Sequence, residues 1–197
     1  MNHLLAISTG AIVGIVIAVV VVVLIIAVVA WYISTYNKLQ NLKNLVEEGW
    51  ATIDVQLKKR YDLIPNLVET VKGYAKHESG TLEAVIAARN AAMTATGDAK
   101  MAAENALTGT LKSLFALQEA YPELKANSNF MDLQRQLTSI ENELASARRY
   151  YNGTVKTINV AIDTFPSNLV AKRMKLEKRT YFELDSAEER KAPAVKF

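Results

Sequence analysis

The sequence predicts an all-α protein, in which a single N-terminal transmembrane helix is followed by an antiparallel four-helix bundle with long coiled-coil-like helices. Three observations support this fold class. All 23 Lys and Arg and all 20 Asp and Glu residues of the 197-residue chain lie at or after Lys38. Residues 11–33 are apolar except for Gly14. After residue 36, apolar residues recur at steps of three and four, as in an amphipathic helix, and no long stretch alternates as a strand does.

The apolar run 11–33 predicts a transmembrane helix. At 1.5 Å per residue its length is about 34 Å, which is enough to cross a hydrocarbon core of about 30 Å. Trp31, Tyr32 and Tyr36 stand at its downstream end, where aromatic side chains act as interfacial anchors. A cleaved signal peptide is the alternative, but the amino end lacks Lys and Arg and the apolar run exceeds the usual length of such a peptide.

Basic residues follow the span and none precedes it, which predicts the orientation. Since the positive side of a span faces the cytoplasm, the N-terminus lies outside and the domain is cytoplasmic. The sequon Asn152-Gly153-Thr154 is then a chance match, because a cytoplasmic domain never meets the glycosylation machinery. The predicted division of the chain is an extracytoplasmic tail (1–10), the transmembrane helix (11–33), the helical bundle (34–165), and a basic short helix with an extended tail (166–197).

The clearest helical pattern alternates steps of three and four over about five heptads, which is typical of a coiled-coil-like seam. Its members are Phe130, Leu133, Leu137, Ile140, Leu144, Ala147, Tyr151, Val155, Ile158, Ile162 and Phe165. An earlier pattern extends from Leu39 to Ala75 and contains Pro65, which disfavours a continuous helix. Whether the first long helix breaks at Pro65 or near Gly80 is open at this point.

Reactive groups do not converge in the sequence, so we expect no catalytic residues, no metal site, no cofactor and no enzyme activity. The chain has no cysteine, and Thr81 stands where a zinc site on one helix would need a histidine after His77. Eight scattered glycines form no phosphate-binding loop. A net charge of +3 is far from the dense positive surface that nucleic-acid binding requires.

Two basic clusters are candidate contacts for anionic lipid or a protein partner. The first is Lys58, Lys59 and Arg60, which the favoured interpretation instead places on a solvated helix face with Asp54 and Asp62 as nearby counter-charges. The second is stronger, because the predicted anchor holds it near an anionic leaflet. It consists of Lys172, Arg173, Lys175, Lys178 and Arg179.

Several long strings in the chain resemble the LemA family of bacterial membrane-anchored helical proteins. They are DVQLKKRYDLIPNLVETVKGYAKHE (54–78), AAR (87–89), LQEAYPELKA (117–126), FMDLQ (130–134), IEN (140–142), ARRYYN (147–152) and FPSN (165–168). The resemblance implies a one-span anchor in the bacterial inner membrane with a cytoplasmic helical bundle, and it supplies no catalytic residues. It also implies scaffolding, or work beside membrane proteases. At Ile158 the family pattern often has a tyrosine.

These observations favour a membrane-anchored, self-associating helical scaffold whose partners are the lipid bilayer, further copies of the chain and a membrane protein such as a protease. The alternatives are a membrane-surface module that binds anionic lipid, and a regulatory partner of a membrane protease. The polar residues shared with the family are either hydrogen-bond partners between helices or a partner-binding surface. They are Asp54, Arg60, Asn66, Glu141, Asn142, Arg148 and Asn152.

Overall fold

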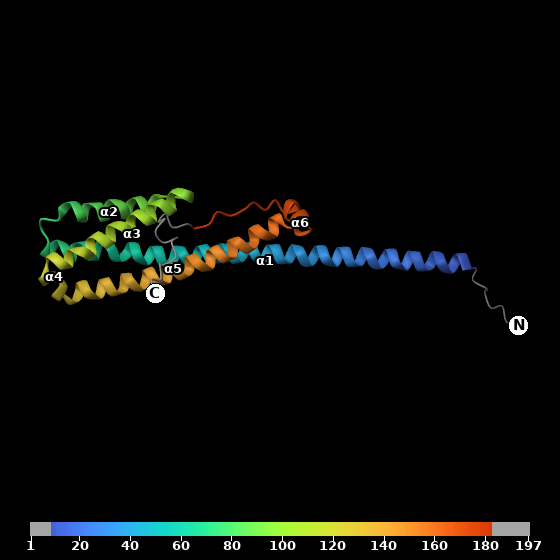
Figure 1. The fold of residues 1–197 in the computed structure, drawn as a ribbon, viewed down its shortest axis with the longest axis horizontal. Coiled ribbons are helices and arrows are strands. Elements are labelled where there is room, and N and C mark those ends of the chain that lie inside the picture. Colours follow the sequence, from blue (N-terminus) through green and yellow to red (C-terminus); the bar gives the residue numbers. More distant parts are fainter. Residues whose placement is uncertain (1–8, 183–197) are drawn as a thin grey trace, which may run out of the picture. The chain divides into compact units, whose positions relative to one another are not determined.

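The computed structural model describes residues 9–182, apart from the side chains of Thr9 and Asp98, and within this range it contains helices and no strands (Figure 1). The predicted all-α class is therefore confirmed for the described residues. The extracytoplasmic tail and the extended tail predicted at the two ends of the chain lie largely outside them. The helices are α1 (Thr9–Tyr74), α2 (Ser79–Thr94), α3 (Gly97–Ala120), α4 (Pro122–Ala126), α5 (Ser128–Asp163) and α6 (Ser167–Arg173).

The chain divides into two compact units. Among the described residues, the first combines the chain up to Leu45 with Lys156–Arg179, and the second combines Val46–Val155 with residues 180–182. Helices α1 and α5 each contribute residues to both units. The domain boundaries expected from the sequence remain predictions.

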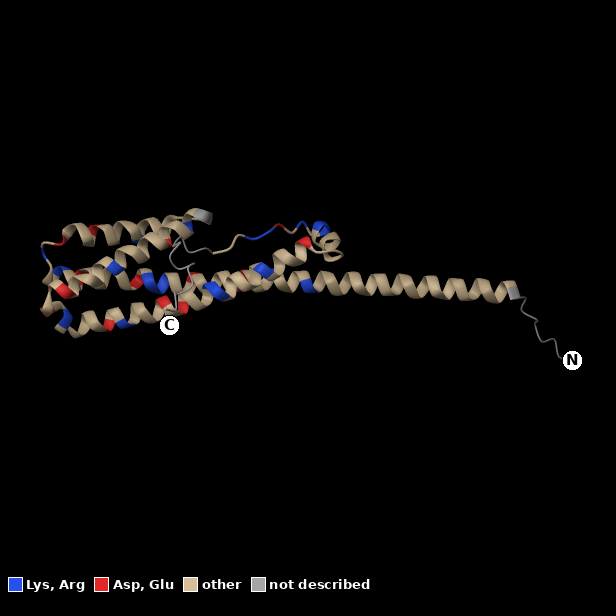
Figure 2. Ribbon diagram, in the orientation of Figure 1, with Lys and Arg blue, Asp and Glu red and all other residues tan. Residues whose placement is uncertain are grey.

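The N-terminal part of α1, in the first unit, is apolar and exposed. Its large side chains from Ile12 to Ile33 are 38–62% exposed, and Figure 2 shows no charged residue in this part of the helix. Among the described residues, α1 is the one helix long and apolar enough to cross a membrane, judged by length and composition. Trp31, Tyr32 and Tyr36, at the end of the apolar run, are 38%, 39% and 43% exposed.

The core of the first unit lies just beyond these aromatic residues. Leu39 is 1% exposed and packs with Val170 and Ala171 of α6. Ala161 and Ile162, in the last turn of α5, pack against the same group, as do Met174 and Leu176 after α6. The end of α5, the turn that follows and α6 are therefore fixed to α1 around a single leucine.

In the second unit, α1, α2, α3 and α5 bury the apolar positions that the helical period predicts. The apolar face of α5 follows the predicted seam, whose members in this unit are buried except for partly exposed Leu133. Gly49 lies where α1 crosses α5, since a Cβ built on it would be 3.4 Å from the Cα of Tyr151. The buried seam residues of this unit are Phe130, Leu137, Ile140, Leu144, Ala147, Tyr151 and Val155.

Pro65 does not break α1, which ends only at Tyr74, so that the chain breaks before Ser79 near Gly80. A proline lacks the N–H that would bond to the carbonyl four residues earlier, here that of Tyr61. The structure supplies another donor, because Nε of Arg89 in α2 lies 2.8 Å from the Tyr61 oxygen. A side chain from α2 thus replaces the missing hydrogen bond of α1 and allows the helix to continue.

The sequence pattern was wrong about Phe165, which it placed in the buried seam. Its side chain is 74% exposed, although Ile158 in the same pattern is 1% exposed. Helix α5 ends at Asp163, so Phe165 lies in the turn before α6 and no longer follows the helical face.

We predict that the cost of removing Arg89 depends on Pro65. Arg89→Met should destabilise the protein by about 1–3 kcal/mol, because the Tyr61 carbonyl loses its donor. In a Pro65→Ala background the restored N–H can bond to that carbonyl, so the same replacement should cost less. Urea unfolding of the full chain in detergent, followed by circular dichroism, measures both costs. Equal costs in the two backgrounds would contradict the assignment.

Candidate functional site

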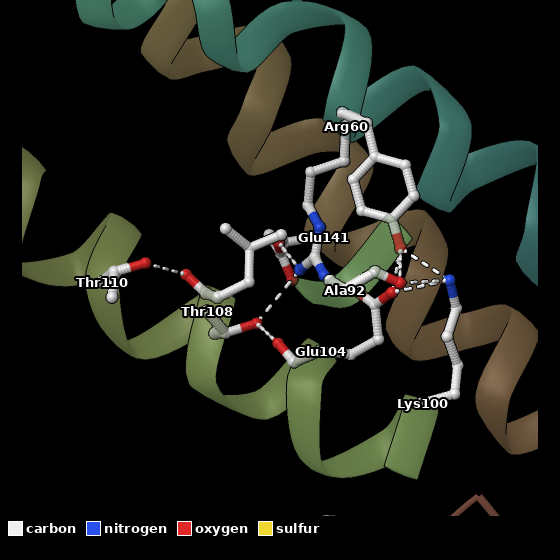
Figure 3. A network of polar contacts seen from close by, with 9 residues as sticks. Arg60, Ala92, Lys100, Glu104, Thr108, Thr110 and Glu141 are labelled. Carbon is white, nitrogen blue, oxygen red and sulfur yellow. Dashed lines mark hydrogen bonds and ion pairs between the residues drawn. The ribbon is translucent and has the colours of Figure 1, made fainter. Parts of the chain in front are cut away.

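A cluster of polar side chains is buried where α1, α3 and α5 meet in the second unit (Figure 3). We call it the Arg60 network. Its members are Arg60 and Tyr61 of α1, Lys100, Glu104 and Thr108 of α3, and Glu141 of α5.

Arg60 is the centre of this network and is 0% exposed. Its guanidinium donates one hydrogen bond to Glu104, whose side chain is also fully buried, through Nη2. Through Nη1 it donates to Oγ1 of Thr108, at 3.0 Å, and to Oε1 of Glu141, at 2.6 Å. A planar guanidinium suits this arrangement, because its donors point outward in a fixed fork toward two helices at once.

Tyr61 and Lys100 are the other two partners of the buried Glu104 carboxylate. The Tyr61 hydroxyl donates to Oε1 of Glu104, and Nζ of Lys100 lies 3.3 Å from the same oxygen. Lys100 also donates to the Tyr61 hydroxyl oxygen, at 2.9 Å, and to the carbonyl of Ala92, at 2.7 Å. Its ammonium is 5.2 Å from the centre of the Tyr61 ring. The network therefore also joins the end of α2 to α3.

The charges of the network balance, with two cations, Arg60 and Lys100, facing two carboxylates, Glu104 and Glu141. Burial raises the pKa of the Tyr61 hydroxyl, and the hydrogen bond to the Glu104 carboxylate raises it further. Tyr61 therefore stays protonated and acts as a donor. Each charged group of the network thus has a partner of opposite sign.

The prediction that Arg60 and Glu141 are hydrogen-bond partners between helices is confirmed. The expectation that the first basic cluster lies on a solvated helix face is wrong for Arg60, which is 0% exposed, because its partners come from other helices. Lys58 and Lys59 lie outside the network. Lys58 is paired with Asp62 at 2.7 Å, and Lys59 lies 3.9 Å from Glu143, all four side chains being at least half exposed. Exposed pairs of this kind contribute little to stability.

Asn152 forms a different contact from the one expected between helices. Its side-chain amide donates to the carbonyl of Phe182, at 2.9 Å, and accepts from the N–H of the same residue, at 2.8 Å. The Phe182 ring is 2% exposed and lies 4.4 Å from the Arg148 guanidinium carbon. Trp50 also contacts this ring, with the centroids 6.1 Å apart. Asn152 and Arg148 therefore hold the segment after α6 against the helices.

In the first unit, Asn159 holds the same segment by the same pair of hydrogen bonds. Its amide donates to the carbonyl of Arg179 and accepts from the Arg179 N–H, both at 2.9 Å. The two asparagines are seven positions apart in a helix and their targets are three positions apart in extended chain, each a rise of about 10 Å. Sequence reasoning missed this correspondence, although the spacing of the two asparagines on one face of α5 was a usable signal.

The second basic cluster is exposed for the most part, on and directly after α6. Lys175, two residues after the end of α6, has a φ of 54°, and the N–H groups of Lys175 and Leu176 bond to the carbonyls of Lys172 and Ala171, both at 3.1 Å. This is the Schellman arrangement, which favours glycine where lysine stands. Lys178 is paired with Asp163 at 2.7 Å. The structure thus gathers Lys172, Arg173 and Lys175 around one short helix.

An open groove of about 480 Å³ lies between α1 and α5 in the second unit. Most of its lining residues are polar, and Tyr150 at its edge is 46% exposed. Within residues 9–182 no group of three or more His, Asp and Glu side chains is placed to hold a metal ion. The residues that line the groove are Thr52, Gln56, Ser139, Asn142, Glu143, Ser146, Ala147 and Tyr150.

A family model and a curated relative both point to the LemA family, and the chain is also similar to magnetosome proteins. The model of the LemA family matches residues 49–197. Protein LemA of Metamycoplasma hominis is 24% identical over 162 residues, which cover 80% of this chain and 73% of that protein. Magnetosome protein MamQ of Magnetospirillum gryphiswaldense is 28% identical over 86 residues, covering 44% of this chain and 32% of the relative. Magnetosome protein MamQ 2 of Paramagnetospirillum magneticum is 26% identical over 87 residues, with the same coverage.

We predict that Glu104→Gln destabilises the protein by about 3–5 kcal/mol, because it leaves Arg60 and Lys100 without a buried counter-charge. The double change Glu104→Gln with Arg60→Met should cost less than the sum of the two single changes, since Arg60→Met removes one of the two uncompensated charges. Urea unfolding of the four proteins in this cycle gives the coupling. Lys58→Met, which breaks an exposed pair, is the control and should cost less than about 1 kcal/mol. Additive costs would show that Arg60 and Glu104 do not act as a pair.

The raised pKa of the Tyr61 hydroxyl predicts that the folded protein loses stability at alkaline pH. Because its pKa is higher in the folded state than the ordinary value of 10.0, the folded protein keeps a proton that the unfolded chain releases. The resulting stability is fully present below pH 10 and is lost as the pH rises further. Tyr61→Phe should make the unfolding free energy fall less steeply above pH 10. Equal slopes in the wild type and Tyr61→Phe would contradict this role.

Proposed function

The chain belongs to the LemA family, and we propose that it is a membrane-anchored helical scaffold that self-associates and has no catalytic activity of its own. The observation that carries the proposal is the continuity of α1. One uninterrupted helix, Thr9–Tyr74, contains both the exposed apolar run and the Arg60 side of the buried network. An element of this kind joins a membrane span to a protein-binding domain without a linker.

The anchoring part of the proposal rests on residues 11–33. Lone spanning segments are helical, because lipid offers no hydrogen-bond partner to the backbone. The exposed apolar side chains of this run are not buried by other described parts of the chain, and lipid is the solvent that suits them. We place this span in a bacterial inner membrane with the N-terminus outside and the helical domain in the cytoplasm, since every Lys and Arg follows the span.

For the domain, we propose an antiparallel four-helix bundle of α1, α2, α3 and α5 with coiled-coil-like packing. The contacts of α1 with α5 support opposite directions: Arg60 bonds to Glu141, whereas Gly49, earlier in α1, approaches Tyr151, later in α5. The short connection from α2 to α3 supports antiparallel neighbours.

The absence of catalysis in this proposal follows from how the polar groups are used. The buried charges of the Arg60 network are paired with one another across three helices. The Asn152 and Asn159 amides are both used to hold backbone. These groups thus contribute to a stable surface, which is what a scaffold presents to its partners.

Self-association is proposed at the groove between α1 and α5. An open groove between two long helices, lined by apolar surface together with hydrogen-bonding side chains, accepts a further helix, and a second copy carries the same helices. The half-exposed Tyr150 ring at its edge is of the type enriched in interfaces.

The second candidate function is binding of anionic lipid by the second basic cluster. It is supported by the exposure of these residues in the unit that also contains the apolar run of α1. Trp31, Tyr32 and Tyr36 are proposed as interfacial anchors in the same region. A regulatory role beside a membrane protease remains a proposal from the family resemblance. The relative MamQ is named as a magnetosome protein, which suggests a magnetosome-associated scaffold as a related role.

We predict that a cysteine at Ser146 crosslinks two copies of the chain. The protein has no cysteine, so Ser146→Cys gives one reactive thiol in the groove. A short bismaleimide added to native membranes should convert most of the protein to a covalent dimer, seen on a denaturing gel. Ser113→Cys, which places an exposed thiol on α3, is the matched control and should stay monomeric.

Dimer formation by both variants would indicate random collision, and its absence from both would contradict self-association through the groove. Blue native electrophoresis of the unmodified protein then tests association at any other surface. A strictly monomeric protein without a partner would overturn the scaffold proposal as a whole.

A further inference from the structure

We propose that Phe165, in the turn between α5 and α6, and Leu169, in the first turn of α6, insert into the interface of the bilayer that residues 11–33 cross. This inference rests on the proposed membrane anchoring. The contact would give the first unit a second, shallow attachment to the membrane beside its spanning helix.

The exposure of two large apolar side chains at one turn is the first observation. Phe165 is 74% exposed and Leu169 is 55% exposed. Among the large hydrophobic side chains described as exposed, Phe165 is exposed to a greater extent than any residue of the proposed span. An aromatic ring left this open on a stable turn is poorly suited to water, and an apolar surrounding would stabilise it.

Hydrogen bonds fix the conformation of the turn, so the position of Phe165 is defined. Oγ of Ser167 donates to the carbonyls of Ala161, at 2.8 Å, and Thr164, at 2.9 Å. The backbone N–H of Asn168 bonds to the Thr164 carbonyl at 2.9 Å. Phe165 lies between these anchored residues and has no place in the Leu39 core.

The position of the turn along α1 is the second observation. Ala161 and Ile162 before the turn, and Val170 and Ala171 after it, pack around Leu39. Leu39 follows Ile33 by about 9 Å along the helix. Since α5 and α1 run in opposite directions in the proposed bundle, Phe165 lies about one turn nearer the span than Leu39. That places it level with Tyr36, in the headgroup region next to the aromatic belt.

The charges around the turn fit a lipid surface. Lys172 and Arg173 belong to the same short helix, and Lys175 follows it. An apolar tip flanked by basic residues is the composition of interfacial membrane-binding segments. A soluble partner or a second copy would need to reach the same level as Tyr36, where lipid headgroups already surround the span, so the bilayer is the occupant that we assign.

The lack of cysteine allows a direct measurement of depth. Single variants Phe165→Cys and Leu169→Cys, each of the full chain, are labelled with an NBD fluorophore and reconstituted into vesicles of phosphatidylcholine and phosphatidylglycerol. Nitroxide quenchers are placed at the headgroup, near the top of the acyl chain or near its end. Leu24→Cys, within the apolar run, is the deep control. Val55→Cys, which is 54% exposed and lies about 33 Å beyond Ile33 along α1, is the aqueous control.

We expect labels at residues 165 and 169 to be quenched about threefold or more above Val55, chiefly by the headgroup and upper-chain nitroxides, whereas Leu24 is quenched most by the deep nitroxide. Circular dichroism of each labelled variant checks that the helices are retained, which the exposure of both positions favours. Deep quenching at Leu24 with no quenching at residues 165 and 169 would overturn this inference and leave the anchoring intact. No quenching at Leu24 would overturn the anchoring, and the inference with it.

Discussion

The second unit depends on the need to neutralise one buried guanidinium. Arg60 has no access to water, and an unpaired charge in that position would cost far more than one helix contact contributes. Its partners must therefore come from neighbouring helices, and Glu104 and Glu141 come from α3 and α5. This requirement fixes how far each helix can slide or rotate. Apolar seams tolerate small shifts between helices, whereas a fork of hydrogen bonds does not.

The same rule, that buried polar groups need partners, governs the backbone next to this network. Pro65 leaves the Tyr61 carbonyl without its usual donor, and Arg89 supplies one from α2. The Tyr61 side chain meanwhile donates to Glu104. One residue of α1 therefore bonds to α2 through its backbone and to α3 through its side chain. Pro65 does not end α1. The carbonyl that it leaves without a donor binds Arg89 and so fixes the position of α2 beside α1.

Much of the fold could be predicted from the sequence, because hydrophobic period and span length are local properties. The apolar run, the helical class and most of the α5 seam follow from spacing alone. Continuation of α1 through Pro65 could not be predicted, since it needs Arg89, which is far away in the sequence. Lys58, Lys59 and Arg60 form one basic run in the sequence, yet only Arg60 is buried. Arg60 is buried because its partners lie on other helices, and a local sequence pattern does not specify such partners.

Phe165 follows the spacing of the buried seam but is exposed, because it lies after the end of the helix. Along α5 the seam residues are buried by the helices that they face, but the helix ends at Asp163 and the ring then leaves that face. The spacing of apolar residues predicts a buried Phe165, because spacing alone does not show where the helix ends. In the folded chain the same ring is carried on a turn that Ser167 and Leu39 hold in place. The Phe165 side chain is therefore exposed and lies outside the core around Leu39, although it continues the spacing of the buried seam.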